Sequence, residues 1–148
     1  MNNNPDPLKI LRSAKTILLV DWPDQRVPRA LVNAGFKVIT YCPDEYSVAK
    51  LIDNLPEGIN GFPPGSADEN GYLVFDAIEG RPEAVDIVNV YRPEKEHERI
   101  IEKLVLPLKA TVLWLQPPVT SVKTKEIALR KPLTFIEGAD IADLASKI

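Results

Sequence analysis

The sequence predicts a three-layer α/β domain built around a mostly parallel sheet. Between residues 85 and 135, short apolar runs alternate with two helix-like stretches. Parallel strands need crossover connections, which helices usually supply. The carboxyl ends of such strands meet at one edge, where ligands bind in open α/β sheets. Two of the runs end in Tyr91-Arg92-Pro93 and Gln116-Pro117-Pro118, so we expect these turns at that edge.

The first half of the chain predicts helices and strands in turn. Asp6-Pro7 is typical of a helix start, and the apolar run over 16–20 predicts a buried strand. A helix is expected to begin near Pro28, with Asp24 as its candidate cap, and to end at Gly35. The spacing further predicts a strand over 36–41, a helix over 44–55 and a short strand over 72–75.

The second half continues the alternation. Strands are expected over 86–91, 111–115 and 133–135, and helices over 94–106, 121–130 and 140–148. Residues 56–71 hold four of the seven glycines and three prolines, which predicts a mobile loop near the ligand edge. We expect a tail and short helix over 1–15 and one domain over 16–148.

Composition excludes several classes of function. The net charge of −3 and the pI of about 5.2 argue against nucleic-acid binding. The apolar runs are strand-sized and predict no membrane span, and no targeting segment is recognised, so a cytoplasmic location is expected. One cysteine, Cys42, and one histidine, His97, allow neither an intrachain disulfide nor a Cys/His zinc cluster.

No catalytic or metal-binding constellation is predicted. His97 lies among charged residues at the start of an expected helix, where a histidine is normally at the surface. Cys42 ends a predicted strand without a histidine partner, which favours packing over nucleophilic chemistry. Whether the protein is an enzyme stays open, and a binding role is favoured.

The first strand-to-helix turn, residues 20–26, lacks the glycines that let a backbone approach phosphate. Asp21 and Asp24 would repel a phosphate, whereas Arg26, Arg29 and the helix N-terminus would attract one. Trp22 is interpreted either as a binding platform or as a packing residue.

A response-regulator receiver is one resemblance. Leu18-Leu19-Val20-Asp21 is similar to its first strand and acidic site, and Lys131-Pro132 to its late Lys-Pro pair. The acceptor of a receiver is an aspartate at the end of its third strand. If that strand is 86–91, it ends in Asn89-Val90-Tyr91 and offers no carboxylate, and taking Asp76 as the acceptor instead leaves one strand too many downstream. The receiver-like interpretation is therefore an alternative only.

A second resemblance spans residues 16–135. The runs 85–92 and 112–116, Val-Asp-Ile-Val-Asn-Val-Tyr-Arg and Val-Leu-Trp-Leu-Gln, resemble those of small CoA-binding Rossmann-fold proteins. These are similar to the CoA-binding domain of the succinyl-CoA synthetase α subunit. The resemblance implies a Rossmann-like sheet that holds CoA across its strand ends.

The same resemblance implies a set of ligand-facing residues. The first turn would face the phosphates, the end of the second strand would lie beside the nucleotide, and two later turns would complete the site. The residues are Asp21, Trp22, Arg26, Tyr41, Cys42, Pro43, Tyr91, Arg92, Pro93, Gln116 and Pro117. A guanidinium at a strand end also suits phosphate recognition, although Arg92 is alternatively a surface or helix-start arginine.

The favoured hypothesis is a protein that binds CoA or a related nucleotide without catalysis of its own. The acidic first turn motivates an alternative, an interaction module that has lost its ligand. An NAD(P)-binding or receiver-like domain is a further alternative. The expected partner is a small nucleotide, with a homo-oligomer or a protein partner left open.

Overall fold

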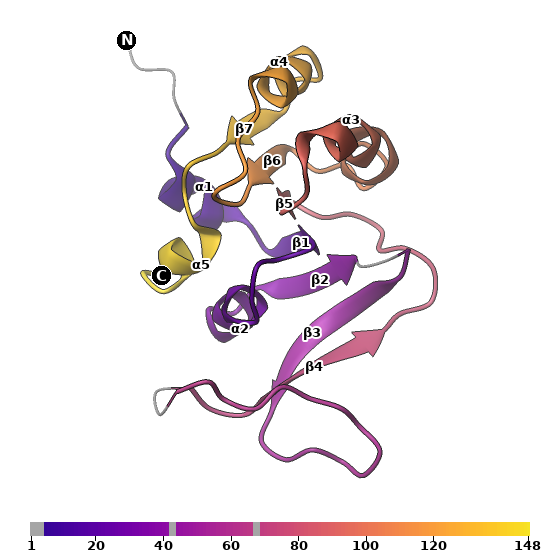
Figure 1. Ribbon diagram of the computed structural model, residues 1–148, viewed down its shortest axis with the longest axis vertical. Coiled ribbons are helices and arrows are strands. Elements are labelled where there is room, and N and C mark those ends of the chain that lie inside the picture. Colours follow the sequence, from indigo (N-terminus) through magenta and orange to yellow (C-terminus); the bar gives the residue numbers. More distant parts are fainter. Residues whose placement is uncertain (1–4, 42–43, 67–68) are drawn as a thin grey trace.

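The computed structural model describes residues 5–41, 44–66 and 69–148. They form one sheet with helices on both of its faces (Figure 1). The strands are β1 (Thr16–Val20), β2 (Lys37–Tyr41), β3 (Tyr46–Ile52), β4 (Tyr72–Ala77), β5 (Ile87–Val90), β6 (Val112–Leu115) and β7 (Thr134–Ile136). The α-helices are α1 (Pro7–Ser13), α2 (Arg26–Asn33), α3 (His97–Ile100), α4 (Val122–Arg130) and α5 (Ile141–Ala145).

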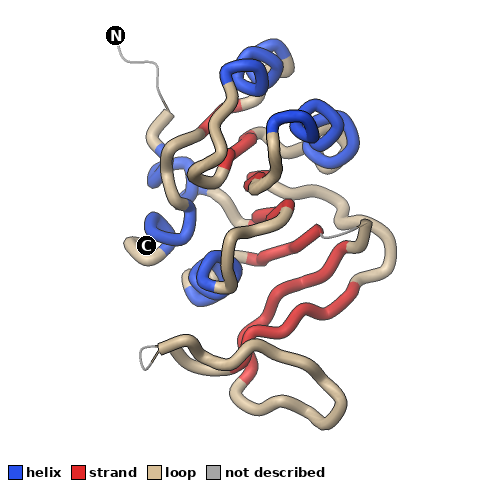
Figure 2. Tube along the Cα trace, viewed as in Figure 1, coloured by secondary structure: helices blue, strands red, loops and turns tan. Residues whose placement is uncertain are grey.

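The sheet has the strand order β4-β3-β2-β1-β5-β6-β7. The neighbours from β2 through β1, β5 and β6 to β7 are parallel, whereas β3 is antiparallel to both β2 and β4. Figure 2 shows the strands running across the middle of the molecule with the helices around them. The prediction of a three-layer, mostly parallel α/β domain is confirmed.

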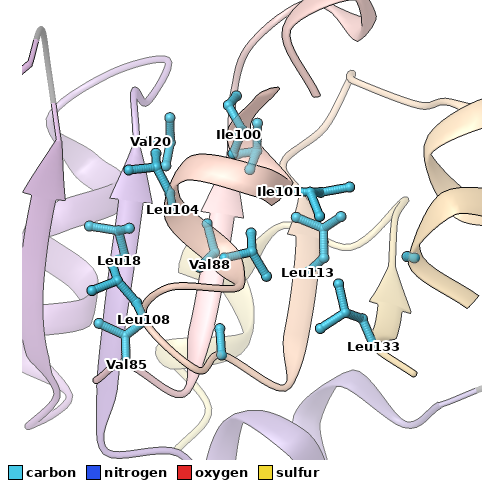
Figure 3. Packing of buried hydrophobic residues seen from close by; sticks show 14 of the residues in the cluster. Leu18, Val20, Val85, Val88, Ile100, Ile101, Leu104, Leu108, Leu113 and Leu133 are labelled. Atoms are coloured by element: carbon cyan, nitrogen blue, oxygen red, sulfur yellow. The ribbon is translucent and has the colours of Figure 1, made fainter. Parts of the chain in front are cut away.

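Each face of the sheet is covered by its own helices. On one face, Leu18 and Val20 of β1 pack with residues of α3 and of the helical turns after it (Figure 3). On the other face, Ile17 and Leu19 pack with residues of α1, α2 and α5. Because successive strand residues point to opposite faces, a strand covered on both sides must be apolar throughout. This explains the uninterrupted apolar run over 17–20.

Two helix ends carry the caps that the sequence predicts, whereas the N-cap of α2 is Gln25 rather than the predicted Asp24. Asp6 accepts hydrogen bonds from the amides of Leu8 and Lys9 at the start of α1. Gly35 follows α2 with a φ of 99°, a conformation that favours glycine. The predicted helix over 94–106 forms as a short 3₁₀ turn (Glu94–Glu96), then α3, then a π-helical turn (Ile101–Val105).

The predicted helix over 44–55 is wrong, because the segment forms β3. Its apolar residues fit a helical spacing, but Ala49 and Leu51 point to the face covered by α2 while Lys50 pairs with Asp76 of β4 at 2.9 Å. Six residue pairs join β3 to β4. The strand is therefore favoured by a partner strand whose paired residues lie twenty or more positions away, which local periodicity cannot show.

The loop between β3 and β4 leaves the sheet at the end opposite to the carboxyl edge of β1, because β3 runs antiparallel to β2. Phe62 then forms an isolated bridge with Leu73, and Arg29 of α2 binds the loop backbone. The mobility of this loop stays a prediction. Across the described ranges, every helix is too short or too polar to traverse a lipid bilayer.

Candidate functional site

The strands at the centre of the sheet end at one level. Val20 of β1 pairs with Tyr41 of β2 and with Val90 of β5, so these three strands share a carboxyl edge. Asp21 follows β1 directly, and Arg92 follows β5 by two residues. The fold therefore brings together two residues that lie 71 positions apart in the sequence.

Asp21 has an unusual backbone conformation, with a φ of 64°. Left-handed backbone is unfavourable for residues with a Cβ, and aspartate tolerates it better than most because its side chain forms local hydrogen bonds. Here Oδ1 accepts from the amide of Trp22 at 2.8 Å. The other oxygen, Oδ2, is left to accept from Arg92.

Arg92 is held by two carboxylates. Its Nη1 lies 3.0 Å from Oδ2 of Asp21, and its Nε and Nη2 lie 3.1 Å and 2.7 Å from the carboxylate of Glu96. The hydrogen bonds to Glu96, and then those to Asp21, raise the pKa of Arg92 above its usual value. In return, the hydrogen bonds from Arg92 lower the pKa of Glu96. The guanidinium is therefore neutralised within the protein.

Arg92, Asp21 and Glu96 line a cavity of about 390 Å³. It lies between the ends of β1 and β2 and the helical segment after β5. Its size lies in the lower range of small-molecule pockets. Apolar side chains form part of its wall. Three cationic and three carboxylate side chains form most of the rest. The lining residues are Val20, Asp21, Tyr41, Asp44, Arg92, Glu96, Arg99, Ile100, Lys103 and Leu104.

Tyr41 contributes an aromatic ring to the cavity. Its hydroxyl donates to Oδ1 of Asp44 at 3.1 Å, and its ring lies 4.9 Å from the ring of Tyr46. Burial raises the pKa of Tyr41, and the hydrogen bond to Asp44 adds to this effect. Asp44 thus has a partner within the cavity wall, as Asp21 and Glu96 have.

Arg99 and Lys103 line the cavity but were not predicted from the sequence. With Glu96, Ile100 and Leu104 they follow the spacing i, i+3, i+4, i+7, i+8, which places residues on one face of a helical segment. The sequence carried this signal. The position of the strand-end turns at the carboxyl edge indicates a ligand-facing role more directly than the spacing within the helix after β5 does.

The prediction that His97 lies at the surface is wrong, because only 2% of the residue is exposed. Its Nε2 lies 2.7 Å from the main-chain oxygen of Arg92, and its Nδ1 lies 2.7 Å from Oγ1 of Thr124 on α4. A carbonyl oxygen can only accept, so Nε2 donates. His97 therefore fastens the Arg92 turn to the neighbouring helix.

A comparison with protein-family models decides the family. The model described as "CoA binding domain" matches residues 21–141, which contain every cavity-lining residue except Val20. The chain belongs to this CoA-binding domain family. Membership supports CoA as the ligand and confirms the resemblance seen in the sequence.

Solved structures show the same fold. A Thermus thermophilus protein is 16% identical with a TM-score of 0.59, and the match covers 94% of this chain and 93% of the other. A protein redesigned for binding is 14% identical with a TM-score of 0.65, covering 99% and 94%. A hypothetical protein from Pyrococcus horikoshii OT3 is 15% identical with a TM-score of 0.62, covering 95% and 88%. A search of curated proteins found no match.

Gln116 lies outside the cavity of this CoA-binding domain. Its side chain is buried, its Nε2 donates to Oδ1 of Asp140, and its Oε1 accepts from Asn89 and from the amide of Ile141. The amide group thus joins β5, β6 and the start of α5. In the described structure it acts as a structural link between these elements.

Arg26 and Trp22 do not line this cavity either. Arg26 donates to Asp140 at 2.6 Å and Asp143 at 2.9 Å and lines a second, larger groove of about 720 Å³ between α2, α5 and the β3–β4 loop. Trp22 stacks on Phe75 with ring centroids 5.5 Å apart, which agrees with its interpretation as a packing residue.

The remaining predicted residues lie in the turns that follow the strands. The amide of Tyr91 donates to the oxygen of Val20, whereas Pro93 precedes the 3₁₀ turn and Pro117 follows β6. Cys42 and Pro43 lie outside the described residues. Over those same ranges, the His, Cys, Asp and Glu side chains form no group of three or more suited to a metal ion.

Proposed function

We propose that the chain binds CoA and places a phosphate-bearing part of it in the cavity at the carboxyl edge of β1, β2 and β5. Membership of the CoA-binding domain family carries the proposal. The cavity lies where open α/β sheets bind nucleotides, and it has cationic, aromatic and apolar groups on its wall. No catalytic step is part of the proposal.

Within this site, Asp21, Tyr41 and Arg92 are the predicted ligand residues that line the cavity. We infer that the ring of Tyr41 contacts the ligand. We also infer that Arg92 gives up its ion pair with Asp21 or Glu96 and binds a phosphate of the ligand instead. Tyr91, Pro93 and Pro117, with Cys42 and Pro43, are proposed as the surrounding turns. Asp21 and Trp22 shape the first turn.

Hydrogen exchange with and without CoA locates the site. Binding in the proposed cavity is expected to slow amide exchange after β1 and from Tyr91 to Leu104, and to leave the loop at residues 59–66 unchanged. Protection of that loop together with α5 would place CoA in the larger groove instead, and would overturn the proposed location.

One observation favours a second candidate, an interaction module without a nucleotide. Arg92 is already neutralised by Asp21 and Glu96, so a phosphate must compete with two carboxylates for it. Native mass spectrometry distinguishes the candidates. A CoA adduct at one per chain supports binding, whereas a protein complex that forms while CoA leaves no adduct supports the module.

A further inference from the structure

The cationic side chains of the cavity differ in whether they form an ion pair. Arg92 forms ion pairs with Asp21 at 3.0 Å and with Glu96 at 2.7 Å. Arg99 and Lys103 also line the cavity, yet none of the ion pairs within residues 5–41, 44–66 and 69–148 includes either of them. These two side chains carry the positive charge that is not yet committed to a partner.

The three carboxylates of the cavity already accept hydrogen bonds from side chains of its wall. Asp21 and Glu96 hold Arg92, and Asp44 accepts from the Tyr41 hydroxyl. An incoming anion would be repelled near the β1 and β2 turns and attracted by the helical wall, where Arg99 and Lys103 stand four residues apart.

The helical segment that carries these two cations also contributes apolar side chains to the cavity wall. Ile100 is 7% exposed and Leu104 is 5% exposed, and both reach the cavity from the same helical segment. Apolar walls reduce the screening of a charge by water, so an anion there interacts more strongly with the two cations than it would on an open surface.

We propose that Arg99 and Lys103 form a phosphate subsite on the helical wall of this cavity, in addition to the phosphate contact proposed for Arg92. The inference rests on the proposed function for the identity of the ligand as CoA. The group recognised is a phosphate, which CoA carries both as a pyrophosphate and as a 3′-phosphate. A guanidinium and an ammonium suit either one.

The test compares the wild type with the double variant Arg99→Gln, Lys103→Gln. The matched control is Lys123→Gln, Lys125→Gln, which removes the same charge from α4, a helix that contributes no residue to this cavity. Calorimetric titrations at low and at moderate ionic strength use CoA, 3′-dephospho-CoA and inorganic pyrophosphate. Circular dichroism melts verify folding, and Arg99→Lys, Lys103→Arg serves as the conservative variant.

We expect the cavity double variant to bind CoA about tenfold or more weakly, with a smaller dependence on salt, because two charged hydrogen-bond donors are lost. The control variant is expected to bind as the wild type does, and the conservative variant to retain most of the affinity. A loss that persists with 3′-dephospho-CoA assigns the subsite to the pyrophosphate. A loss that disappears assigns it to the 3′-phosphate.

The outcomes separate this inference from the proposed function. Equal CoA affinity in all variants overturns the subsite and leaves CoA binding intact. Binding of pyrophosphate that requires Arg99 and Lys103, in a wild type that ignores CoA, supports the subsite and overturns CoA as the ligand. A wild type that binds none of the three compounds overturns both.

Discussion

Nε2 of His97 donates a hydrogen bond to the main-chain oxygen of Arg92 over 2.7 Å. The same ring contacts Oγ1 of Thr124 through Nδ1, also over 2.7 Å. One buried side chain thus connects the turn after β5 with α4. The position of Arg92 beside the cavity depends on this connection as well as on its own ion pairs.

Replacement of His97 by alanine is expected to lower the free energy of unfolding by about 2–4 kcal/mol. The change leaves a buried cavity and removes hydrogen bonds from Thr124 and from the Arg92 carbonyl. Urea denaturation measures the loss. Glu98→Ala, at the exposed neighbouring position, serves as the control. Equal stability of the two variants would show that the His97 contacts do not hold the turn.

Replacement of Asp21 by asparagine is expected to strengthen CoA binding by about three- to tenfold, because Arg92 loses one of its two carboxylates. Asp21→Gly tests the same point and also relieves the left-handed backbone, which costs an L-residue about 1 kcal/mol. Asp24→Asn, in the same turn but outside the cavity lining, is the control. Weaker CoA binding by Asp21→Asn would instead make its carboxylate a ligand contact.

The parallel half of the sheet was predictable because its central strands are largely buried on both faces and therefore mostly apolar. β6 appears as a short apolar run and β5 as one interrupted only by Asn89, and both end at a proline-containing turn. The strand β3 was not predictable in this way. Its ladder with β4 depends on residues beyond a long loop, and its apolar positions also fit a helix.

The candidate site was predicted in part. Arg92 and Tyr41 were expected at the carboxyl edge from their places at strand ends, and the cavity contains both. His97 is buried because α3 packs against α4. The charged residues around His97 in the sequence indicate an exposed position and give no sign of this packing. Gln116 was assigned to the ligand, but its partners come from β5 and α5, and their proximity follows only from the folded chain.

The guanidinium of Arg29 fastens the β3–β4 loop to α2. It donates to the main-chain oxygens of Phe62 at 2.9 Å and Gly71 at 3.0 Å and pairs with Glu69 at 2.9 Å. Arg29→Ala is expected to cost about 3 kcal/mol, since it removes charged hydrogen bonds from a side chain that is almost fully buried.

The same variant tests the mobility of the loop. Limited proteolysis within residues 56–66 is expected to become faster in Arg29→Ala, and Arg29→Lys is expected to rescue it only in part, because an ammonium cannot reach all of these acceptors. Arg12→Ala, at an exposed position on α1, controls for the loss of charge. Unchanged cleavage in Arg29→Ala would show that other contacts hold the loop.

Asp140 is the meeting point of α2, β6 and α5. Its Oδ1 accepts from Gln116 at 2.8 Å and from the amide of Ala142 at 2.9 Å, and its Oδ2 accepts from Arg26 at 2.6 Å. Burial alone raises the pKa of Asp140, but the hydrogen bonds from Arg26, Gln116 and Ala142 outweigh it and lower the pKa below the usual 3.8.

A carboxylate whose pKa is lower in the folded state than in the unfolded state stabilises the fold when it is ionised. The contribution of Asp140 is therefore complete above about pH 5 and disappears as the pH falls through its folded pKa, which lies below 3.8. Asp140→Asn keeps an acceptor for Ala142 but loses this charge. We expect it to be less stable than the wild type by about 1–3 kcal/mol at pH 7.

The difference in unfolding free energy between wild type and Asp140→Asn is expected to shrink between pH 5 and pH 2, because protonation then removes the same charge from the wild type. Urea denaturation at several pH values measures it. Asp143→Asn removes a more exposed partner of the same Arg26 and should show a smaller difference at pH 7. A difference that stays constant down to pH 2 would mean that the charge of Asp140 does not stabilise this junction, and that its role there is limited to capping α5.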